Sequence, residues 1–176
     1  VKCYEAVTEF CGWPSIEAGK TMGLFPYGKP NEDINKLLMD ERQSEYWPLS
    51  DRNIVLPCYP NGATINQNLI RGFTHVEVGE EKNKYDHQLC KDLAYAVQVE
   101  TQEAMLNMII KSAEMCDTKN VVLSGGYGLN CVANYYYLDK LNELGINLYV
   151  EPVSNDAGTA MGAALYAHLE ETDKFV

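Results

Sequence analysis

The chain has 176 residues, of which 46% are hydrophobic and 22% are charged, and its formal net charge is −11. This length and composition suit one globular domain with a hydrophobic core, with or without a further smaller lobe. The acidic excess argues against broad nucleic-acid binding, and no apolar run is long enough to span a membrane. The six cysteines form no Cys-x-x-Cys pair, so we expect reduced thiols and a cytoplasmic protein.

The first half of the chain predicts short helices followed by a loop-rich stretch. Residues 1–12 place apolar side chains at helical spacing and stop at a glycine. Residues 15–28 predict a short helix and a tight loop, and residues 31–42 predict a further helix with Asn31 as its N-cap. From residue 43 to 85 the pattern is loose, which indicates an irregular insertion with two or three short strands at most.

The second half alternates helices and strands. Residues 85–116 predict a long helix, and residues 120–126 a short buried strand that ends in paired glycines. A second helix over 129–145, a second strand over 146–152 and a third helix over 154–171 follow. This order is typical of an α/β arrangement whose strands pair in parallel.

The loop after the first of these strands is a candidate ligand-binding turn. Gly125 and Gly126 allow a backbone to approach a ligand closely, and the helix start that follows offers unpaired N–H groups. The loop has neither the Lys-Ser/Thr of a Walker loop nor the spacing of the dinucleotide fingerprint. Taken alone, paired glycines after a strand are more often a turn than a site.

Asp156 stands at the start of the third helix, one strand later. It is either an ordinary N-cap or a carboxylate over the crevice at the carboxyl ends of parallel strands, where it would ligate a metal or face a phosphate. Because the two loops follow successive strands, we give the structural and the functional interpretation about equal weight. Glu17 and Lys20 are either a surface ion pair or the residues that hold ribose hydroxyls and a phosphate or carbamoyl group.

Four segments read together resemble one family. They are EAGKTMGLFPYGKP, LAYAVQVETQEAM, LSGGYGLNCVAN and NDAGTAMGAAL. They resemble, in the same order, motifs of the O-carbamoyltransferases of the NodU/CmcH type. The first domain of that family is similar to the universal tRNA threonylcarbamoyl-transfer protein, which has an actin/Hsp70-like (ribonuclease H-like) fold. The resemblance covers residues 1–30 and 86–168, and the middle stretch matches poorly.

The resemblance implies a ligand and a reaction. Carbamoyl-adenylate, made from carbamoyl phosphate and ATP in a second domain, would bind this lobe. Its carbamoyl group would pass to a hydroxyl of a small-molecule acceptor, such as a sugar or an antibiotic-like compound. Gly125, Gly126 and Asn130 would line the nucleotide. Glu17 would face the ribose, with Lys20 nearby.

The resemblance also implies a divalent metal, Fe²⁺ in the family, with Asp156 as one ligand. The family's His-x-x-x-His metal pair does not occur in the chain, and Tyr127 and Gly128 replace the usual Val-Ala beside the expected adenine pocket. We therefore expect residues 1–176 to be the second α/β lobe of the N-terminal domain, with the insertion at 43–85. The preceding lobe and the adenylate-forming domain would lie outside the chain, which alone should be inactive.

Two other functions fit the same pattern. The chain could be an ATPase or sugar-kinase-like lobe of the same superfamily, which would transfer phosphate and ignore carbamoyl phosphate. It could also be a non-catalytic interaction module, an interpretation that Tyr127 and the loose stretch at 43–85 favour. The acceptor and the oligomeric state do not follow from the sequence.

Overall fold

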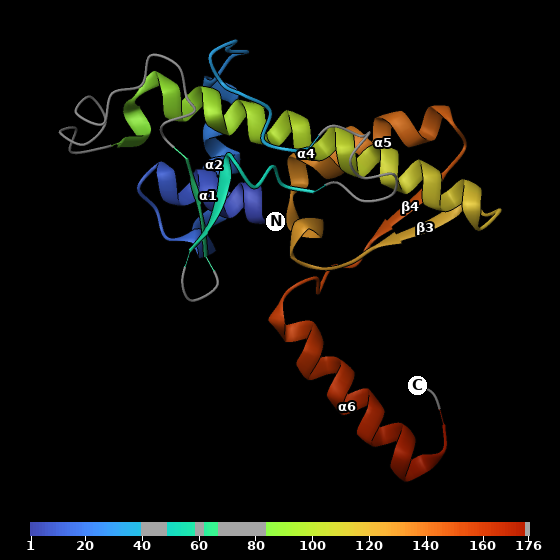
Figure 1. Ribbon diagram of the computed structural model, residues 1–176. Helices are drawn as coiled ribbons and strands as arrows, with labels where there is room; N and C mark the ends of the chain where they lie inside the picture. The colour runs from blue at the N-terminus through green and yellow to red at the C-terminus, as the bar shows by residue number, and fades with distance from the viewer. Residues whose placement is uncertain (40–48, 59–61, 67–83, 175–176) are drawn as a thin grey trace. The chain divides into compact units, whose positions relative to one another are not determined.

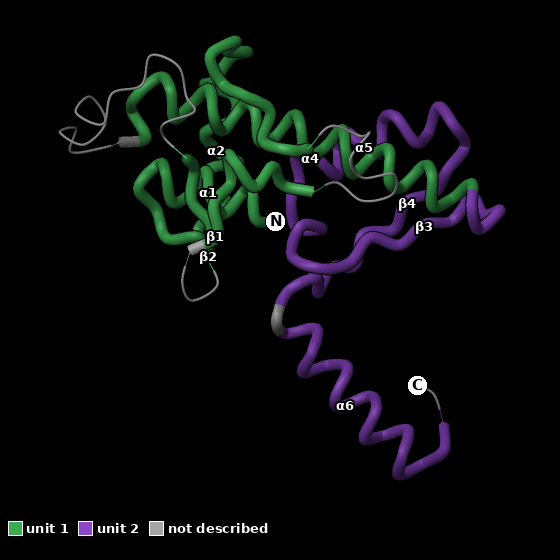
Figure 2. Tube along the Cα trace, in the orientation of Figure 1, with its two compact units in different colours: residues 1–114 green, residues 115–176 purple. Residues whose placement is uncertain are grey.

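A computed structural model describes residues 1–39, 49–58, 62–66 and 84–174. The contacts between residues divide the chain into two compact units, residues 1–114 and residues 115–176, called unit 1 and unit 2 (Figure 2). Within the described residues, no helix combines the length and the apolar character that a membrane span needs.

Unit 1 consists of helices around a small antiparallel hairpin (Figure 1). The described elements are α1 (Lys2–Phe10), the short 3-10 helix η1 (Ser15–Glu17), α2 (Ala18–Leu24), η2 (Phe25–Tyr27), β1 (Val55–Cys58), β2 (Gly62–Ile65), η5 (Lys84–Asp86) and α4 (Gln88–Met115). The helices predicted within residues 1–12, 15–28 and 85–116 are thereby confirmed. Two short strands lie within the predicted insertion, and its residues 43–48, 59–61 and 67–83 lie outside the described residues.

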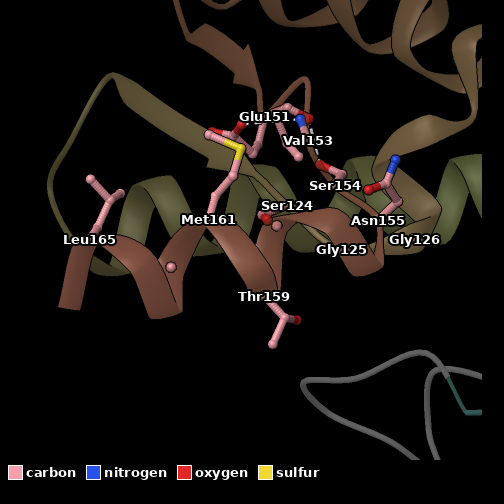
Figure 3. Close-up of a pocket in the computed structure, with 12 residues that line it drawn as sticks. Ser124, Gly125, Gly126, Glu151, Val153, Ser154, Asn155, Thr159, Met161 and Leu165 are labelled. Atoms are coloured by element: carbon pink, nitrogen blue, oxygen red, sulfur yellow. Dashed lines mark hydrogen bonds between the residues drawn. The ribbon is translucent and has the colours of Figure 1, made fainter. Parts of the chain in front are cut away.

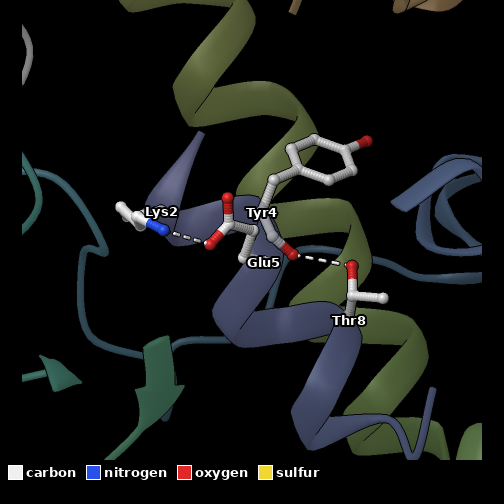
Figure 4. Close-up of polar contacts among 4 residues, drawn as sticks. All are labelled: Lys2, Tyr4, Glu5 and Thr8. Atoms are coloured by element: carbon white, nitrogen blue, oxygen red, sulfur yellow. Dashed lines mark hydrogen bonds and ion pairs between the residues drawn. The ribbon is translucent and has the colours of Figure 1, made fainter. Parts of the chain in front are cut away.

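Helix α1 supplies much of the core of unit 1. It buries Tyr4 and Val7 and packs against β2, and β2 buries Ile65, the partner of Val55 in the hairpin. The Tyr4 hydroxyl donates a hydrogen bond to Gln98 of α4. Polar contacts also run along α1, where the Thr8 hydroxyl donates to the Tyr4 carbonyl at 2.7 Å (Figure 4).

The helix predicted over residues 31–42 is wrong for residues 31–39, which form turns; residues 40–42 lie outside the described residues. Asn31 caps no helix. Its Nδ2 donates to Asp92 of α4 at 3.0 Å, and its Oδ1 accepts from the Asp33 amide. Glu100 on α4 also accepts hydrogen bonds from two backbone amides of this segment, those of Leu37 and Leu38, at 2.8 and 3.1 Å. These long-range bonds replace the hydrogen bonds that a local helix would make.

Unit 2 has the predicted alternation of strands and helices. Its elements are β3 (Asn120–Leu123), η6 (Gly126–Leu129), α5 (Cys131–Glu143), β4 (Asn147–Val150) and α6 (Asp156–Thr172). Strands β3 and β4 pair in parallel, with Val121 opposite Leu148, as the sequence predicted. The prediction that the first of these strands is buried is wrong, because the residues of β3 are exposed or half-buried. The fold is therefore mixed α/β, with one antiparallel and one parallel strand pair in the described part of the chain.

Helix α5 connects the two parallel strands. It buries Ala133, Tyr137 and Leu141, which recur every four residues and so share one face of the helix. A crossover helix of this kind directs the carboxyl ends of β3 and β4 to the same edge of the pair. The loops that follow the two strands therefore meet at that edge.

Candidate functional site

The first of these loops is a glycine turn, residues 125–129. Gly125 has φ +94°, a conformation that side-chain-bearing residues rarely adopt. Its carbonyl accepts a hydrogen bond from the Gly128 amide at 2.8 Å, and the Tyr127 carbonyl accepts from the Asn130 amide at 3.0 Å. The paired glycines thus turn the chain from β3 directly into α5.

The second loop leads from β4 into α6. Asn155 is the N-cap of α6, because the side-chain oxygen of Asn155 accepts a hydrogen bond from the Ala157 amide at 2.9 Å. The interpretation of Asp156 as the N-cap is therefore wrong, since Asp156 is the first residue of the helix proper. Asn and Asp are equally good caps, so the sequence could not choose between neighbours. The Asp156 side chain lies outside the described structure, and its metal-binding role stays a prediction.

An open cavity of about 630 Å³ lies between the two loops (Figure 3). Its lining residues come from the end of β3, the loop after β4 and the first turns of α6: Ser124, Gly125, Gly126, Glu151, Val153, Ser154, Asn155, Gly158, Thr159, Met161, Gly162 and Leu165. The structure thus brings Gly125 and Gly126 together with the start of α6 at one surface of unit 2. Gly125 and Gly126 contribute only backbone to the lining, and Met161 and Leu165 contribute apolar side chains.

Two of the lining glycines have open space where a side chain would be. A Cβ atom on Gly126 or on Gly162 would meet nothing within 4 Å, and neither residue has a positive φ. Gly158 is different, because its Cβ would lie 2.6 Å from the Val153 carbonyl oxygen. The fold of unit 2 thus requires glycine at position 158, whereas at 126 and 162 the glycines keep the cavity open.

Asn130 occupies a structural position beside the glycine turn. Its Oδ1 accepts from the Ala133 amide at 3.0 Å and so caps α5, and the residue is only 8% exposed. It is not among the residues that line the cavity. The predicted contact of Asn130 with a nucleotide stays a prediction beside this observed capping role.

Glu17 and Lys20 lie in unit 1 and form an ion pair, with 2.7 Å between Nζ of Lys20 and Oε2 of Glu17. Lys20 Nζ also lies 5.9 Å from the centre of the Trp13 ring. Both charged side chains are partly exposed, so a pair of this kind contributes little to stability. Their predicted role toward a nucleotide stays a prediction.

The described residues hold no group of three or more His, Cys, Asp or Glu side chains that could bind a metal ion. A stable site for a divalent cation generally needs several such ligands. One carboxylate, that of Asp156, does not make such a site. The residues described therefore do not by themselves fit the predicted metal.

Comparison with known proteins identifies the family. The sequence profile described as the carbamoyltransferase N-terminus matches residues 2–165. The chain belongs to the carbamoyltransferase family. The match includes both loops of the cavity and the segment that contains Glu17 and Lys20.

Two curated relatives each match 92% of the chain. An uncharacterised protein of Synechocystis, sll1178, is 31% identical over 167 residues, which are 26% of its own length. The nodulation protein NolNO of Sinorhizobium fredii is 28% identical over 166 residues, which are 22% of its length. The chain thus spans about a quarter of the length of these relatives.

Several residues that line the cavity were not predicted. Glu151, Ser154 and Met161 all border the cavity. Glu151 directly follows β4, so its position at a strand end was a usable signal. Ser154 and Met161 had no such signal, because the loop conformation and the direction of α6 place them.

Proposed function

We propose that this chain is the nucleotide-binding lobe of an O-carbamoyltransferase, with the actin/Hsp70-like fold, and that the cavity of unit 2 holds the nucleotide. The observation that carries the proposal is the pair Gly126 and Gly162. Both keep space open at the cavity although the fold itself would tolerate a larger residue. Small residues at the start of a helix and beside a strand end let a ligand approach the backbone closely.

The size and the lining of the cavity support a nucleotide. Its volume of about 630 Å³ falls in the range of small-molecule pockets, roughly 300–1,000 Å³. Met161 and Leu165 offer apolar contact for a base, and both are about half exposed. Glu151 brings a carboxylate that can accept hydrogen bonds from hydroxyl groups.

The reaction we propose is carbamoyl transfer from carbamoyl-adenylate, formed from carbamoyl phosphate and ATP elsewhere in the whole protein. The acceptor hydroxyl oxygen bonds to the carbamoyl carbon, the bond from that carbon to the phosphate oxygen breaks, and AMP leaves while the hydroxyl loses its proton. Gly125 and Gly126 would line the nucleotide. The family resemblance adds Asn130 beside the nucleotide, and Glu17 toward its ribose with Lys20 nearby.

We also propose a divalent metal, Fe²⁺, with Asp156 as one ligand, on the strength of the family resemblance. A metal beside an acyl-phosphate polarises it and orients the leaving group. Since the described residues do not complete a site, no step above depends on the metal. The acceptor is proposed to be a small molecule such as a sugar or an antibiotic-like compound, and the reaction to take place in the cytoplasm.

A non-catalytic interaction module is the second candidate. It is favoured by exposed apolar side chains on the parallel strands, since Val122 is 67% and Tyr149 57% exposed. Such side chains on adjacent strands can mark a contact surface. This candidate predicts partner binding without any nucleotide requirement.

The experiment is an assay of the whole protein with ¹⁴C-labelled carbamoyl phosphate, ATP, Fe²⁺ and a panel of hydroxylated acceptors. We expect label in an acceptor only when ATP is present, with AMP released in equal amount. Phosphate transfer to the acceptor that ignores carbamoyl phosphate would favour the kinase-like alternative. No transfer and no nucleotide binding would favour the interaction module.

A further inference from the structure

The glycine turn at residues 125–129 is fixed from the side of α5 by Asn134. The Nδ2 group of Asn134 donates a hydrogen bond of 2.7 Å to the Gly128 carbonyl oxygen. Gly128 in turn donates its amide to the Gly125 carbonyl at 2.8 Å. One side chain on a rigid helix thus holds the turn at its far end, two residues from Gly126.

Ser154 limits the turn from the opposite side. It is only 3% exposed, and its hydroxyl donates to the Glu151 carbonyl at 2.5 Å, which fixes the side chain in place. A Cβ atom on Gly128 would lie 3.3 Å from the Ser154 Oγ. Gly128 therefore lies between Asn134, which binds its carbonyl, and Ser154, which leaves little room for a side chain at this position.

Asn134 is unfavourable for the stability of α5 at its position. Asparagine is a poor helix former away from a cap, and Asn134 lies inside α5. In the described structure its Oδ1 is buried and has no hydrogen-bond partner. A buried polar atom without a partner destabilises a fold. A residue selected for the stability of α5 alone would have neither property, so the bond to Gly128 points to a role outside the helix.

We propose that Asn134 is a positioning residue for the ligand in the unit 2 cavity. By fixing the Gly128 carbonyl against Ser154, it holds Gly125 and Gly126 in the conformation that lines the cavity. The inference rests on the proposed function, since the ligand it serves is the nucleotide. Asn134 does not line the cavity itself and acts through the turn.

The test compares Asn134→Ala with the wild-type protein and with Asn142→Ala, the same change at an exposed position of α5. Three quantities are measured: the melting midpoint, hydrogen exchange by mass spectrometry over residues 125–130, and the affinity for ATP. We expect the midpoint of Asn134→Ala to stay within about 3 °C of wild type or to rise, because the buried Oδ1 is removed as well. Exchange should quicken and ATP affinity should fall, each about fivefold, as expected for one lost hydrogen bond.

The other outcomes would overturn either the inference about Asn134 or the proposed function. Loss of folding or a clearly lower midpoint in Asn134→Ala would show an ordinary structural role and overturn the inference. Unchanged exchange over the turn, or ATP affinity equal to that of wild type, would also overturn it. If wild type itself binds no ATP, the proposed function fails, and the exchange measurement alone then decides whether Asn134 fixes the turn.

Discussion

A Cβ atom on Gly28 would overlap the backbone carbonyl oxygen of Lys91, because the loop after α2 lies directly against the backbone of α4. The same contact region is held by hydrogen bonds. The amide of Lys29 donates to Asp92 of α4 at 3.0 Å, and Phe25 stacks on Tyr95 with ring centres 5.7 Å apart. This close approach fixes the segment that carries Glu17 and Lys20 against the longest helix of unit 1.

Replacing Gly28 with alanine should therefore destabilise unit 1. The added methyl group would overlap backbone atoms that cannot rotate away, and we expect a loss of about 1–3 kcal/mol in the free energy of unfolding. Urea denaturation measures this loss. Gly19→Ala is the control, because a Cβ there would meet nothing within 4 Å. Equal stability of the two variants would contradict the observed contact.

Replacing Gly126 with alanine should leave the fold intact and weaken nucleotide binding. The Cβ would enter open space in the protein but would occupy the cavity. We expect an unchanged melting midpoint and an ATP affinity lower by about 5- to 150-fold, the effect of a steric conflict of about 1–3 kcal/mol. Titration calorimetry measures the affinity, and Gly19→Ala again controls for the glycine-to-alanine change. Full ATP affinity in a folded Gly126→Ala protein would count against the cavity as the nucleotide site.

The prediction that Lys20 acts on the nucleotide can be separated from its ion pair. Lys2 and Glu5 form a pair with the same spacing on α1, with 2.6 Å between Nζ and Oε2 (Figure 4). Lys2→Ala and Lys20→Ala should each change stability by less than about 1 kcal/mol, because exposed pairs contribute little. Only Lys20→Ala should lower ATP affinity or the rate of carbamoyl transfer. Equal effects of the two changes in both assays would show that Lys20 is an ordinary surface residue.

Glu100 should make the stability of unit 1 depend on pH. Burial raises the pKa of this carboxyl above the ordinary value of 4.5, although hydrogen bonds from the Leu38 and Leu37 amides partly oppose the shift. A raised pKa in the folded state means that this group stabilises the fold below about pH 4.5, and that the contribution is lost as the pH rises through the folded-state pKa. Above its folded-state pKa, Glu100 therefore carries a poorly solvated charge in the folded protein.

Glu100→Gln keeps an oxygen acceptor for the two amides and removes that charge. Its free energy of unfolding should exceed that of wild type at pH 7, and the difference should shrink as the pH falls toward 4.5. Urea denaturation across this range measures the difference. Glu114→Gln, at an exposed position of α4, controls for the loss of a negative charge. A difference that is constant with pH would contradict the raised pKa of Glu100.

The parts of the fold that could be predicted from sequence are those with local signals. The paired glycines after β3 and the small residues at the start of α6 indicated where both cavity loops lie, because the residue preferences of turns depend on only a few neighbouring residues. The turns at residues 31–39 could not be predicted, since Asn31 is held by Asp92, 61 positions away. A local pattern of apolar residues cannot reveal a distant carboxylate that accepts hydrogen bonds from the backbone amides of this segment.

The same limit applies to the site. Gly125 and Gly126 were predicted and line the cavity, whereas Glu151 and Ser154 were missed. Asn130 was predicted to bind the nucleotide, and the structure shows it capping α5. Residue types such as Asn serve both roles, so the sequence alone does not separate a cap from a ligand contact.

The most direct test of the proposed nucleotide site is photolabelling of the whole protein with azido-ATP, followed by mass-spectrometric mapping of the labelled peptides. We predict saturable labelling of peptides that contain residues 124–130 or 151–165, and loss of that labelling when excess ATP is added. Saturable labelling that ATP suppresses but that lies entirely outside these peptides would contradict it.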